Sequence, residues 1–244
     1  MTATVTVVCM KWGTAYSSRY VNILRAMTAR HLARPHRFVC LTDDTAGLHP
    51  EIETFAIPDV PLPPHKKDRP WRKLALFAPG VADLAGPCLY LDLDVVVVDA
   101  LDPFFDVPGD VVIIENWTQR GQGIGNSSVF RWVAGAHDSI YNDFRKDPDG
   151  IIRDVPNEQT YLSHQVAAAG HRLAFWPDAW VRSFKYHCRP VFPLNWVRAP
   201  RKPEGARVIA FHGRPNPPDT ATHGPLHPKK YFRPAPWVAD HWKE

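Results

Sequence analysis

The sequence LYLDLDVVVV at positions 89–98 places two acids inside the most apolar stretch of the chain. It predicts a strand over 88–98, and because side chains alternate along a strand, Asp92 and Asp94 are expected to point to the same side. Two carboxylates among buried apolar residues cost free energy unless something compensates them. A hard divalent cation such as Mg²⁺ or Mn²⁺, shared with the phosphates of a ligand, is one such compensator. The alternative is a pair of acids at an exposed strand end that accept hydrogen bonds from backbone amides.

Strand and helix patterns alternate along the rest of the chain. Strands are expected at 4–10, 37–42, 88–98, 110–114, 127–133, 172–176 and 207–211, and helices at 15–32, 71–77, 136–146 and 157–169. This alternation predicts an α/β fold with a mixed, mostly parallel sheet flanked by helices. In such sheets ligands bind at the carboxyl ends of the strands, which is where Asp92 and Asp94 are expected.

Composition excludes several classes of protein. A chain that is 45% hydrophobic and 22% charged is not disordered, and 4 cysteines in 244 residues do not form a disulfide scaffold. Its longest apolar runs, such as 95–98, are far shorter than the roughly 20 residues of a membrane span. The N-terminus, MTATVTVVCMKWG, lacks the basic region and cleavage site of a signal peptide, so we expect a cytoplasmic protein.

Basic residues are concentrated near the C-terminus. Residues 181–244 contain 12 Lys and Arg against 4 Asp and Glu, together with 11 of the 25 prolines. Such a segment can attract phosphates or an anionic membrane surface, so a peripheral membrane contact is one expectation. The alternative is a solvated extended segment that wraps the core. No nucleic-acid-binding motif occurs, and no nucleic-acid partner is expected.

Several short motifs between positions 5 and 218 occur in a fixed order. They are Lys11-Trp12-Gly13 after the first strand, WRKL at 71–74 with Phe77, LYLDLDVVVV followed by LDPFF, GNSSVF at 125–130, NEQT at 157–160 and FHGRP at 211–215. Together they resemble the motifs of GT-A-type glycosyltransferases, and most closely those of glycosyltransferase family 8 and its glycogenin-like bacterial relatives. The chain departs from that pattern where Ser127 and Ser128 replace Ala and Gly, where Glu158 replaces Asp, and where Arg214 replaces Lys.

The resemblance implies a GT-A fold and a metal-dependent glycosyltransferase. Its substrates would be a nucleotide-diphosphate sugar, with UDP-hexose favoured, and a hydroxyl acceptor such as a sugar, glycan or small molecule; family 8 enzymes retain the anomeric configuration. It also implies that His212 joins Asp92 and Asp94 in holding Mn²⁺ or Mg²⁺. Imidazole favours Mn²⁺ over Mg²⁺. The alternative for His212 is an exposed surface position.

Candidate donor-binding residues lie near the ends of expected strands and in the resembling motifs. They are Lys11, Trp12, Gly13, Asp43, Lys73, Asn126, Ser127, Gly213 and Arg214. Trp12 can stack on a base, Asp43 can bind a base or ribose, Lys73 and Arg214 can contact the diphosphate, and Asn126 and Ser127 can bind sugar hydroxyls. Gly213 lets the backbone approach the phosphates. Each has a plainer alternative: a core aromatic residue, a turn, or ordinary surface charge.

Glu158 and Gln159 are the candidate catalytic residues. They begin a helix for which Asn157 is the expected cap. The resemblance places them near the anomeric carbon, where Glu158 would stabilise positive charge on the sugar ring. The alternative for Glu158 is stabilisation of the helix dipole.

Other function classes share some of these features. A glycoside hydrolase is disfavoured because Asp92 and Asp94 are two residues apart on one expected strand, which suits a cation better than flanking a scissile bond. A nucleotidyltransferase would show a Gly-rich basic signature near the first strand, and a binding protein of GT-A fold that has lost catalysis is a further alternative. We expect a single catalytic domain over 1–218, with a basic, Pro- and aromatic-rich tail over 219–244 that packs on it or extends from it.

Overall fold

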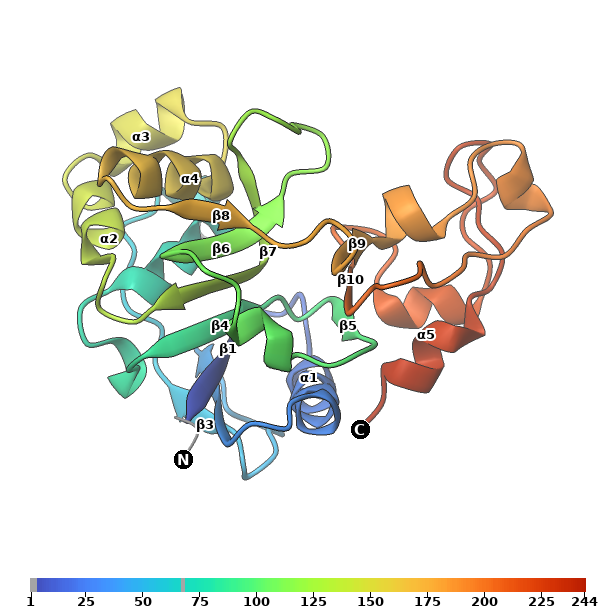
Figure 1. The fold of residues 1–244 in the computed structure, drawn as a ribbon, viewed down its shortest axis with the longest axis horizontal. Helices are drawn as coiled ribbons and strands as arrows, with labels where there is room; N and C mark the ends of the chain where they lie inside the picture. Colours follow the sequence, from blue (N-terminus) through green and yellow to red (C-terminus); the bar gives the residue numbers. More distant parts are fainter. Residues whose placement is uncertain (1–3, 67–68) are drawn as a thin grey trace.

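The strand β1 (Val5–Lys11) is buried along its whole length. In the computed structural model, which describes residues 4–66 and 69–244, β1 lies within a seven-stranded sheet (Figure 1). The strands run in the order β3 (Glu53–Phe55), β2 (His36–Thr42), β1, β4 (Pro87–Leu91), β7 (Gly125–Val133), β6 (Val111–Glu115) and β8 (Leu173–Phe175). Among these strands, β7 is antiparallel to both neighbours and the other pairs are parallel. The predicted mixed, mostly parallel α/β sheet is confirmed.

Helices cover both faces of the large sheet. One face packs against α1 (Ser18–His31), and the other against α2 (Asp138–Phe144), α4 (Glu158–Ala168) and a 3₁₀ helix at Pro70–Phe77, with α3 (Pro148–Asp154) alongside. Along β1, Val7 and Cys9 point toward the face of the sheet that α1 covers, whereas Val8 and Met10 point toward the face that α2 and α4 cover. A strand buried on both faces needs apolar side chains at nearly every position, which explains the unbroken apolar run of β1.

The expected single strand over 88–98 is wrong, because the chain changes sheets at the two aspartates. After β4 ends at Leu91, Asp92–Asp94 form a turn, and β5 (Val95–Val97) joins a second, three-stranded sheet. In that sheet β10 (Val208–Ala210) pairs with β5 on one side and β9 (Val181–Ser183) on the other. The valines of β5 pack in the core against α1, so their apolar character reflects burial there and not membership of the large sheet.

The C-terminal segment is more structured than a simple tail. After β9 it forms a π-helix at Phe184–Cys188, 3₁₀ helices at Leu194–Trp196 and Pro217–Ala221, and α5 (Pro236–His241). Phe232, Val238 and Trp242 are buried in the core that also contains α1. The Arg30 side chain donates hydrogen bonds to the carbonyl oxygens of His241 and Lys243, at 2.9 and 2.7 Å. The chain end is thereby fixed beside α1, while the loops between β9 and α5 extend away from the large sheet (Figure 1).

Some element boundaries also differ from the sequence expectations. The helix expected over 15–32 begins only at Ser18, and β3, α3, β9 and α5 were not expected. Further 3₁₀ helices occur at Pro64–Lys66, Val81–Asp83 and Asp102–Phe105. Within the described ranges, no helix has the length and apolar character that crossing a bilayer requires.

Candidate active site

A cavity of about 430 Å³ lies beyond the carboxyl ends of β1 and β4. It brings together most of the residues predicted for the site: Trp12, Lys73, Asp92, Asp94, Asn126, Ser127, Glu158, Gln159, His212 and Gly213. These residues come from segments far apart in the chain, so the cavity is a product of the tertiary fold. We refer to it below as the first cavity.

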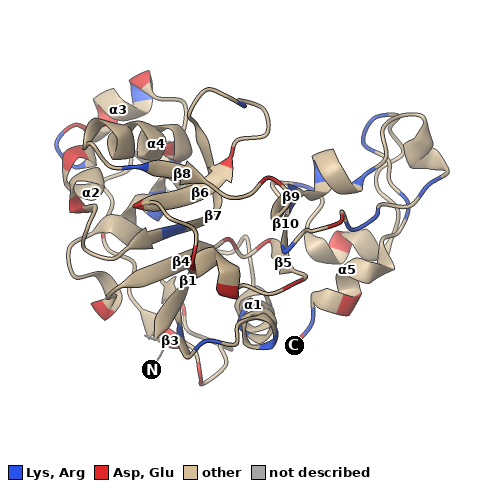
Figure 2. Ribbon diagram, viewed as in Figure 1, with Lys and Arg blue, Asp and Glu red and all other residues tan. Residues whose placement is uncertain are grey.

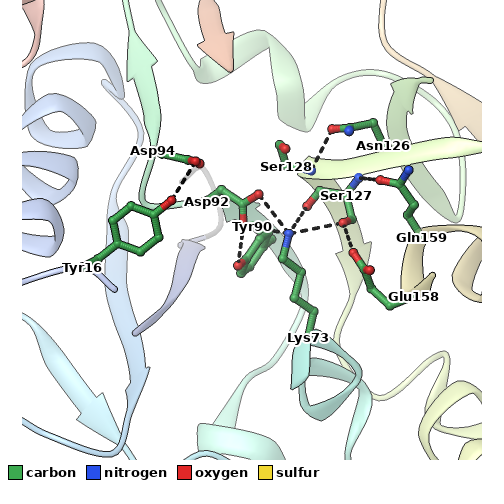
Figure 3. Close-up of polar contacts among 10 residues, drawn as sticks. All are labelled: Tyr16, Lys73, Tyr90, Asp92, Asp94, Asn126, Ser127, Ser128, Glu158 and Gln159. Carbon is green, nitrogen blue, oxygen red and sulfur yellow. Dashed lines mark hydrogen bonds and ion pairs between the residues drawn. The ribbon is translucent and has the colours of Figure 1, made fainter. Parts of the chain in front are cut away.

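Asp92 is held by a lysine and a tyrosine. Lys73 Nζ lies 2.7 and 2.9 Å from the two carboxylate oxygens of Asp92, and the Tyr90 hydroxyl donates to Oδ1 at 2.8 Å (Figure 3). Lys73 Nζ also donates to the carbonyl oxygen and the hydroxyl of Ser127, at 3.2 Å each. An ammonium group has three protons to donate, and these partners use all of them. Lys73 therefore lines the cavity with its charge already directed at Asp92 and Ser127.

Asp94 is a buried carboxylate beside a second one. The residue is 8% exposed, and Oδ2 accepts a hydrogen bond of 2.9 Å from the Tyr16 hydroxyl (Figure 3). Burial and the negative charge of Asp92 raise the pKa of Asp94 to about 7, although the Tyr16 hydrogen bond and Lys73 counteract this in part. A group that carries positive charge into the cavity would relieve the repulsion between the two carboxylates.

Glu158 and Gln159 enter the cavity from the start of α4. The Asn157 side chain accepts a 2.9 Å hydrogen bond from the Thr160 backbone N–H, which confirms it as the helix cap. Glu158 is buried, and its Oε1 accepts a 2.7 Å hydrogen bond from the Ser127 hydroxyl (Figure 3). Gln159 Oε1 accepts a longer bond, of 3.4 Å, from the Ser127 N–H. Because Lys73 also donates to Ser127, a polar chain connects the Asp92 carboxylate to that of Glu158.

His212 reaches the same cavity through the small sheet. Antiparallel pairing sets Ala210 opposite Val95, and the Phe211 N–H donates to the Asp94 carbonyl at 3.1 Å, so residue 212 follows directly beside the Asp92–Asp94 turn. The imidazole Nε2 lies 2.7 Å from the Ser183 hydroxyl. Burial, with Lys185 and His187 nearby, lowers the pKa of His212 to about 4, so the ring is neutral near pH 7.

Asp92, Asp94 and His212 are the candidate ligands for a divalent cation. Residues 4–66 and 69–244 contain no group of three or more His, Cys, Asp or Glu side chains arranged closely enough to hold a metal ion. The first cavity nevertheless contains the donor types that Mn²⁺ accepts, namely two carboxylates and a neutral imidazole. The mutual repulsion that raises the pKa of Asp94 is also what a bound cation would remove. The donor types of Asp92, Asp94 and His212 therefore suit a divalent cation, although within the described residues the three side chains do not form a closed ligand group.

Four predicted donor-binding residues do not line the first cavity: Lys11, Gly13, Asp43 and Arg214. Lys11 Nζ lies 3.5 Å from an Asp44 carboxylate oxygen, and the Gly13 N–H donates to Asp43 Oδ2 at 3.0 Å. These contacts join the ends of β1 and β2 and shape the loop that carries Trp12. Arg214 points elsewhere, since its side chain is 82% exposed, pairs with Asp219 at 3.0 Å, and lines a second cavity.

Sequence reasoning missed several residues of the first cavity. Tyr90 lies on β4, two positions before Asp92. Strand alternation could therefore have placed its hydroxyl on the same side of the sheet as the Asp92 carboxylate. Ser128 lies next to the predicted Ser127. For Tyr16 the sequence contained no signal, because its contact with Asp94 spans 78 positions.

No protein-family model matches the sequence, and no curated protein sequence matches it significantly. The structure is similar to that of galactosyltransferase LgtC in complex with donor and acceptor sugar analogues. The identity is 16%, the match covers 87% of this chain and 88% of that chain, and the TM-score is 0.58. A structure of an LgtC active-site mutant with a glutamine replaced by glutamate matches at 17% identity, 87% and 89% coverage and a TM-score of 0.57.

The chain has the GT-A fold. The mixed sheet and its flanking helices belong to this fold, in agreement with the fold that the motif resemblance implies. At 16–17% identity the similarity establishes the fold.

Proposed function

We propose that the protein is a metal-dependent glycosyltransferase that moves a sugar, favoured as the hexose of a UDP-hexose, to a hydroxyl acceptor. The observation that carries this proposal is the first cavity, where Asp92, Asp94 and His212 meet Glu158 and Gln159 in a GT-A fold. Its support is the similarity to LgtC, whose structure contains donor and acceptor sugar analogues.

The cation-binding residues in this proposal are Asp92, Asp94 and His212, with Mn²⁺ favoured over Mg²⁺ because one donor is an imidazole. When bound, the cation supplies Lewis-acid stabilisation of the negative charge that forms on the departing diphosphate. Lys73 and Tyr90 orient the Asp92 carboxylate, and Tyr16 orients that of Asp94.

Donor binding in this proposal involves Trp12, Asn126, Ser127 and Gly213, which all line the first cavity. Trp12 is half-buried and offers an aromatic face to a base, and the Asn126 side chain can bind sugar hydroxyls. Gly213 has a φ of 68°, a backbone conformation that favours glycine and leaves the chain open to a phosphate. Lys11, Gly13 and Asp43 act indirectly, by holding the Trp12 loop.

Glu158 is proposed to stabilise the positive charge that develops on the sugar ring. Gln159 would contact the sugar or the acceptor. Transfer is proposed to retain the anomeric configuration.

Replacing Glu158 with glutamine is expected to lower kcat about 10²- to 10³-fold, because it removes the charge and keeps the side-chain shape. The Ser127 hydroxyl can still donate to the glutamine oxygen, so stability should change by less than about 1 kcal/mol. Steady-state release of the nucleotide diphosphate measures this, with Glu204→Gln, an exposed site, as the control. Unchanged kcat in Glu158→Gln would contradict the role.

The test of the proposed function is thermal unfolding with UDP, UDP-glucose and UDP-galactose, each with Mn²⁺ or with a chelator. A ligand at 100 times its Kd adds about 2.7 kcal/mol of stability. For a chain of this size that raises Tm by several degrees, at roughly 2–4 °C per kcal/mol. A shift that needs both nucleotide and Mn²⁺ supports the proposal. The absence of any shift with these and with other nucleotide sugars would overturn it in favour of a GT-A protein without donor chemistry.

Domain organisation and localisation stay predictions. We propose that residues 1–218 form the catalytic domain and that 219–244 pack on it, as the burial of Phe232, Val238 and Trp242 supports. Peripheral membrane contact through the basic tail has no support beyond its charge.

A further inference from the structure

A second cavity, of about 530 Å³, lies next to the first. Consecutive residues mark the boundary, since Gly213 lines the first cavity and Arg214 lines the second. Lys185 also lies at this boundary: its Nζ donates to the His212 carbonyl, and a Cβ added to Gly213 would lie 3.6 Å from it. A molecule in the second cavity is thus close to the segment that borders the proposed donor site.

The second cavity carries a strong excess of positive charge. Its lining includes the cations Lys185, Arg189, Arg214 and Lys230 against one carboxylate, Asp219. Figure 2 shows the wider setting, in which Lys and Arg predominate on the loops between β9 and α5. The four cations and the one carboxylate give the cavity residues a formal charge of +3, counting His223 as neutral. A doubly charged ligand such as a phosphate monoester matches this charge better than a singly charged ligand does.

Most of these cations have no acidic partner. Only Arg214 forms an ion pair within the described ranges, with Asp219; Lys185, Arg189 and Lys230 form none with residues 4–66 or 69–244. The Arg189 side chain donates to the Lys230 backbone carbonyl at 3.2 Å, which fixes this guanidinium beside the segment that carries Lys230. Lys185, Arg189 and Lys230 line the same cavity, so their like charges face one shared space. An anion between them would offset these charges.

We propose that the second cavity binds a phosphate monoester group of the acceptor. Arginine and lysine form charge-assisted hydrogen bonds to phosphate oxygens. The guanidinium group of Arg189 or of Arg214 can donate two parallel hydrogen bonds to one phosphate. Phe232 and Pro225 add an apolar wall against which the carbon skeleton of a sugar can pack. The assignment to the acceptor rests on the proposed function, because it assumes that the first cavity holds the donor.

A phosphate monoester can belong to a free sugar phosphate or to a lipid head group, and the experiment has an arm for each. Isothermal titration of the full chain uses glucose 6-phosphate, with glucose as the uncharged control. Co-sedimentation uses vesicles with phosphatidic acid, and phosphatidylcholine vesicles as the control. Binding of glucose 6-phosphate but not glucose supports a soluble acceptor, and binding to phosphatidic acid vesicles alone supports a lipid-borne one. Binding of neither phosphate probe would overturn the proposal.

The variants Arg189→Gln and Lys230→Gln test the location. Each is expected to weaken binding of the phosphate probe about tenfold, which is the loss of one charge-assisted hydrogen bond. Lys229→Gln is the matched control, because Lys229 is the exposed neighbour of Lys230 and does not line the cavity. Urea midpoints close to that of the wild type would show that the variants are folded. An equal loss in Lys229→Gln would overturn the site in favour of general surface attraction.

The same variants separate this inference from the proposed function. Arg189→Gln and Lys230→Gln are expected to keep the thermal shift with UDP and Mn²⁺. If that shift falls together with phosphate binding, the second cavity belongs to the donor diphosphate and the acceptor assignment is wrong. If the wild type shows no UDP shift at all but binds the phosphate probe through Arg189 and Lys230, the glycosyltransferase proposal fails and the anion site stands.

Discussion

Replacing Asp94 with asparagine is expected to stabilise the cation-free protein at pH 8 by about 2–4 kcal/mol. The pKa of Asp94 is about 7 in the folded chain, against an ordinary value of 3.8. Between about pH 4 and pH 7 the folded state therefore holds a proton that the unfolded state has released. The stability of the wild type falls as pH rises through this window, and the Asp94→Asn variant, which has no carboxyl group to titrate at this position, would be free of that loss. Urea unfolding at pH 5 and pH 8 in a chelator measures it, and the gain should be largest at pH 8.

The same substitution is expected to lower the rate of sugar transfer strongly. Loss of one of two carboxylates at the proposed cation site should lower kcat/KM at least about 10³-fold, since the cation stabilises the leaving diphosphate. Mn²⁺ should stabilise the wild type at pH 8 but not Asp94→Asn. Asp240→Asn, at an exposed position on α5, is the control and should change neither stability nor transfer. A variant that is less stable than the wild type at pH 8 would show that Asp94 is not a destabilised carboxylate, and normal Mn²⁺ dependence would remove it from the cation site.

Replacing Lys73 with methionine is expected to destabilise the fold by about 2–4 kcal/mol, because it leaves Asp92 without its counter-charge and removes the hydrogen bonds that Ser127 accepts from the lysine. The Lys73 side chain is 8% exposed and that of Asp92 is 20% exposed, so the cost should fall somewhat below the roughly 3–5 kcal/mol typical of breaking a fully buried pair. Methionine has a similar length and fills the space of the lysine stem, so the loss reports on the charge and hydrogen bonds. Urea unfolding at pH 7 measures the change.

A double-mutant cycle isolates the contact between Lys73 and Asp92. Lys73→Met combined with Asp92→Asn should recover part of the stability lost in Lys73→Met alone, because the neutral amide needs no counter-charge. Strictly additive effects would mean that Lys73 stabilises the fold through Ser127 or through packing, and not through Asp92.

Local sequence patterns were sufficient for the sheet and for one end of the site. Strands buried on both faces need near-continuous apolar runs, so β1, β2 and β4 could be found without knowing their neighbours. Asn157 was recognised as a cap because its side-chain oxygen accepts from the Thr160 N–H, a bond made within one turn. Asp92 and Asp94 stood out because acids are rare within such an apolar stretch.

Contacts between distant segments decided the rest. The expected strand over 88–98 divides because Val95–Val97 pair with Val208–Ala210, a partner more than a hundred positions away that a periodicity argument does not include. That pairing places His212 beside Asp94, while the bend after Gly213 directs Arg214 into the second cavity. Lys73 and Arg214 are both cations and were both predicted to contact the diphosphate. In the folded chain Lys73 lines the first cavity, whereas Arg214 lines the second.

The sequence by itself determined which residues could form the buried strands and which carboxylates and cations were available for chemistry, because these depend on residue type and short-range spacing. Only the tertiary structure decided how those groups interact. The raised pKa of Asp94 follows from burial and from the nearby charge of Asp92, and the net positive charge of the second cavity follows from the convergence of Lys185, Arg189, Arg214 and Lys230. Burial and charge–charge distance are properties of the folded chain, so no local pattern encodes them.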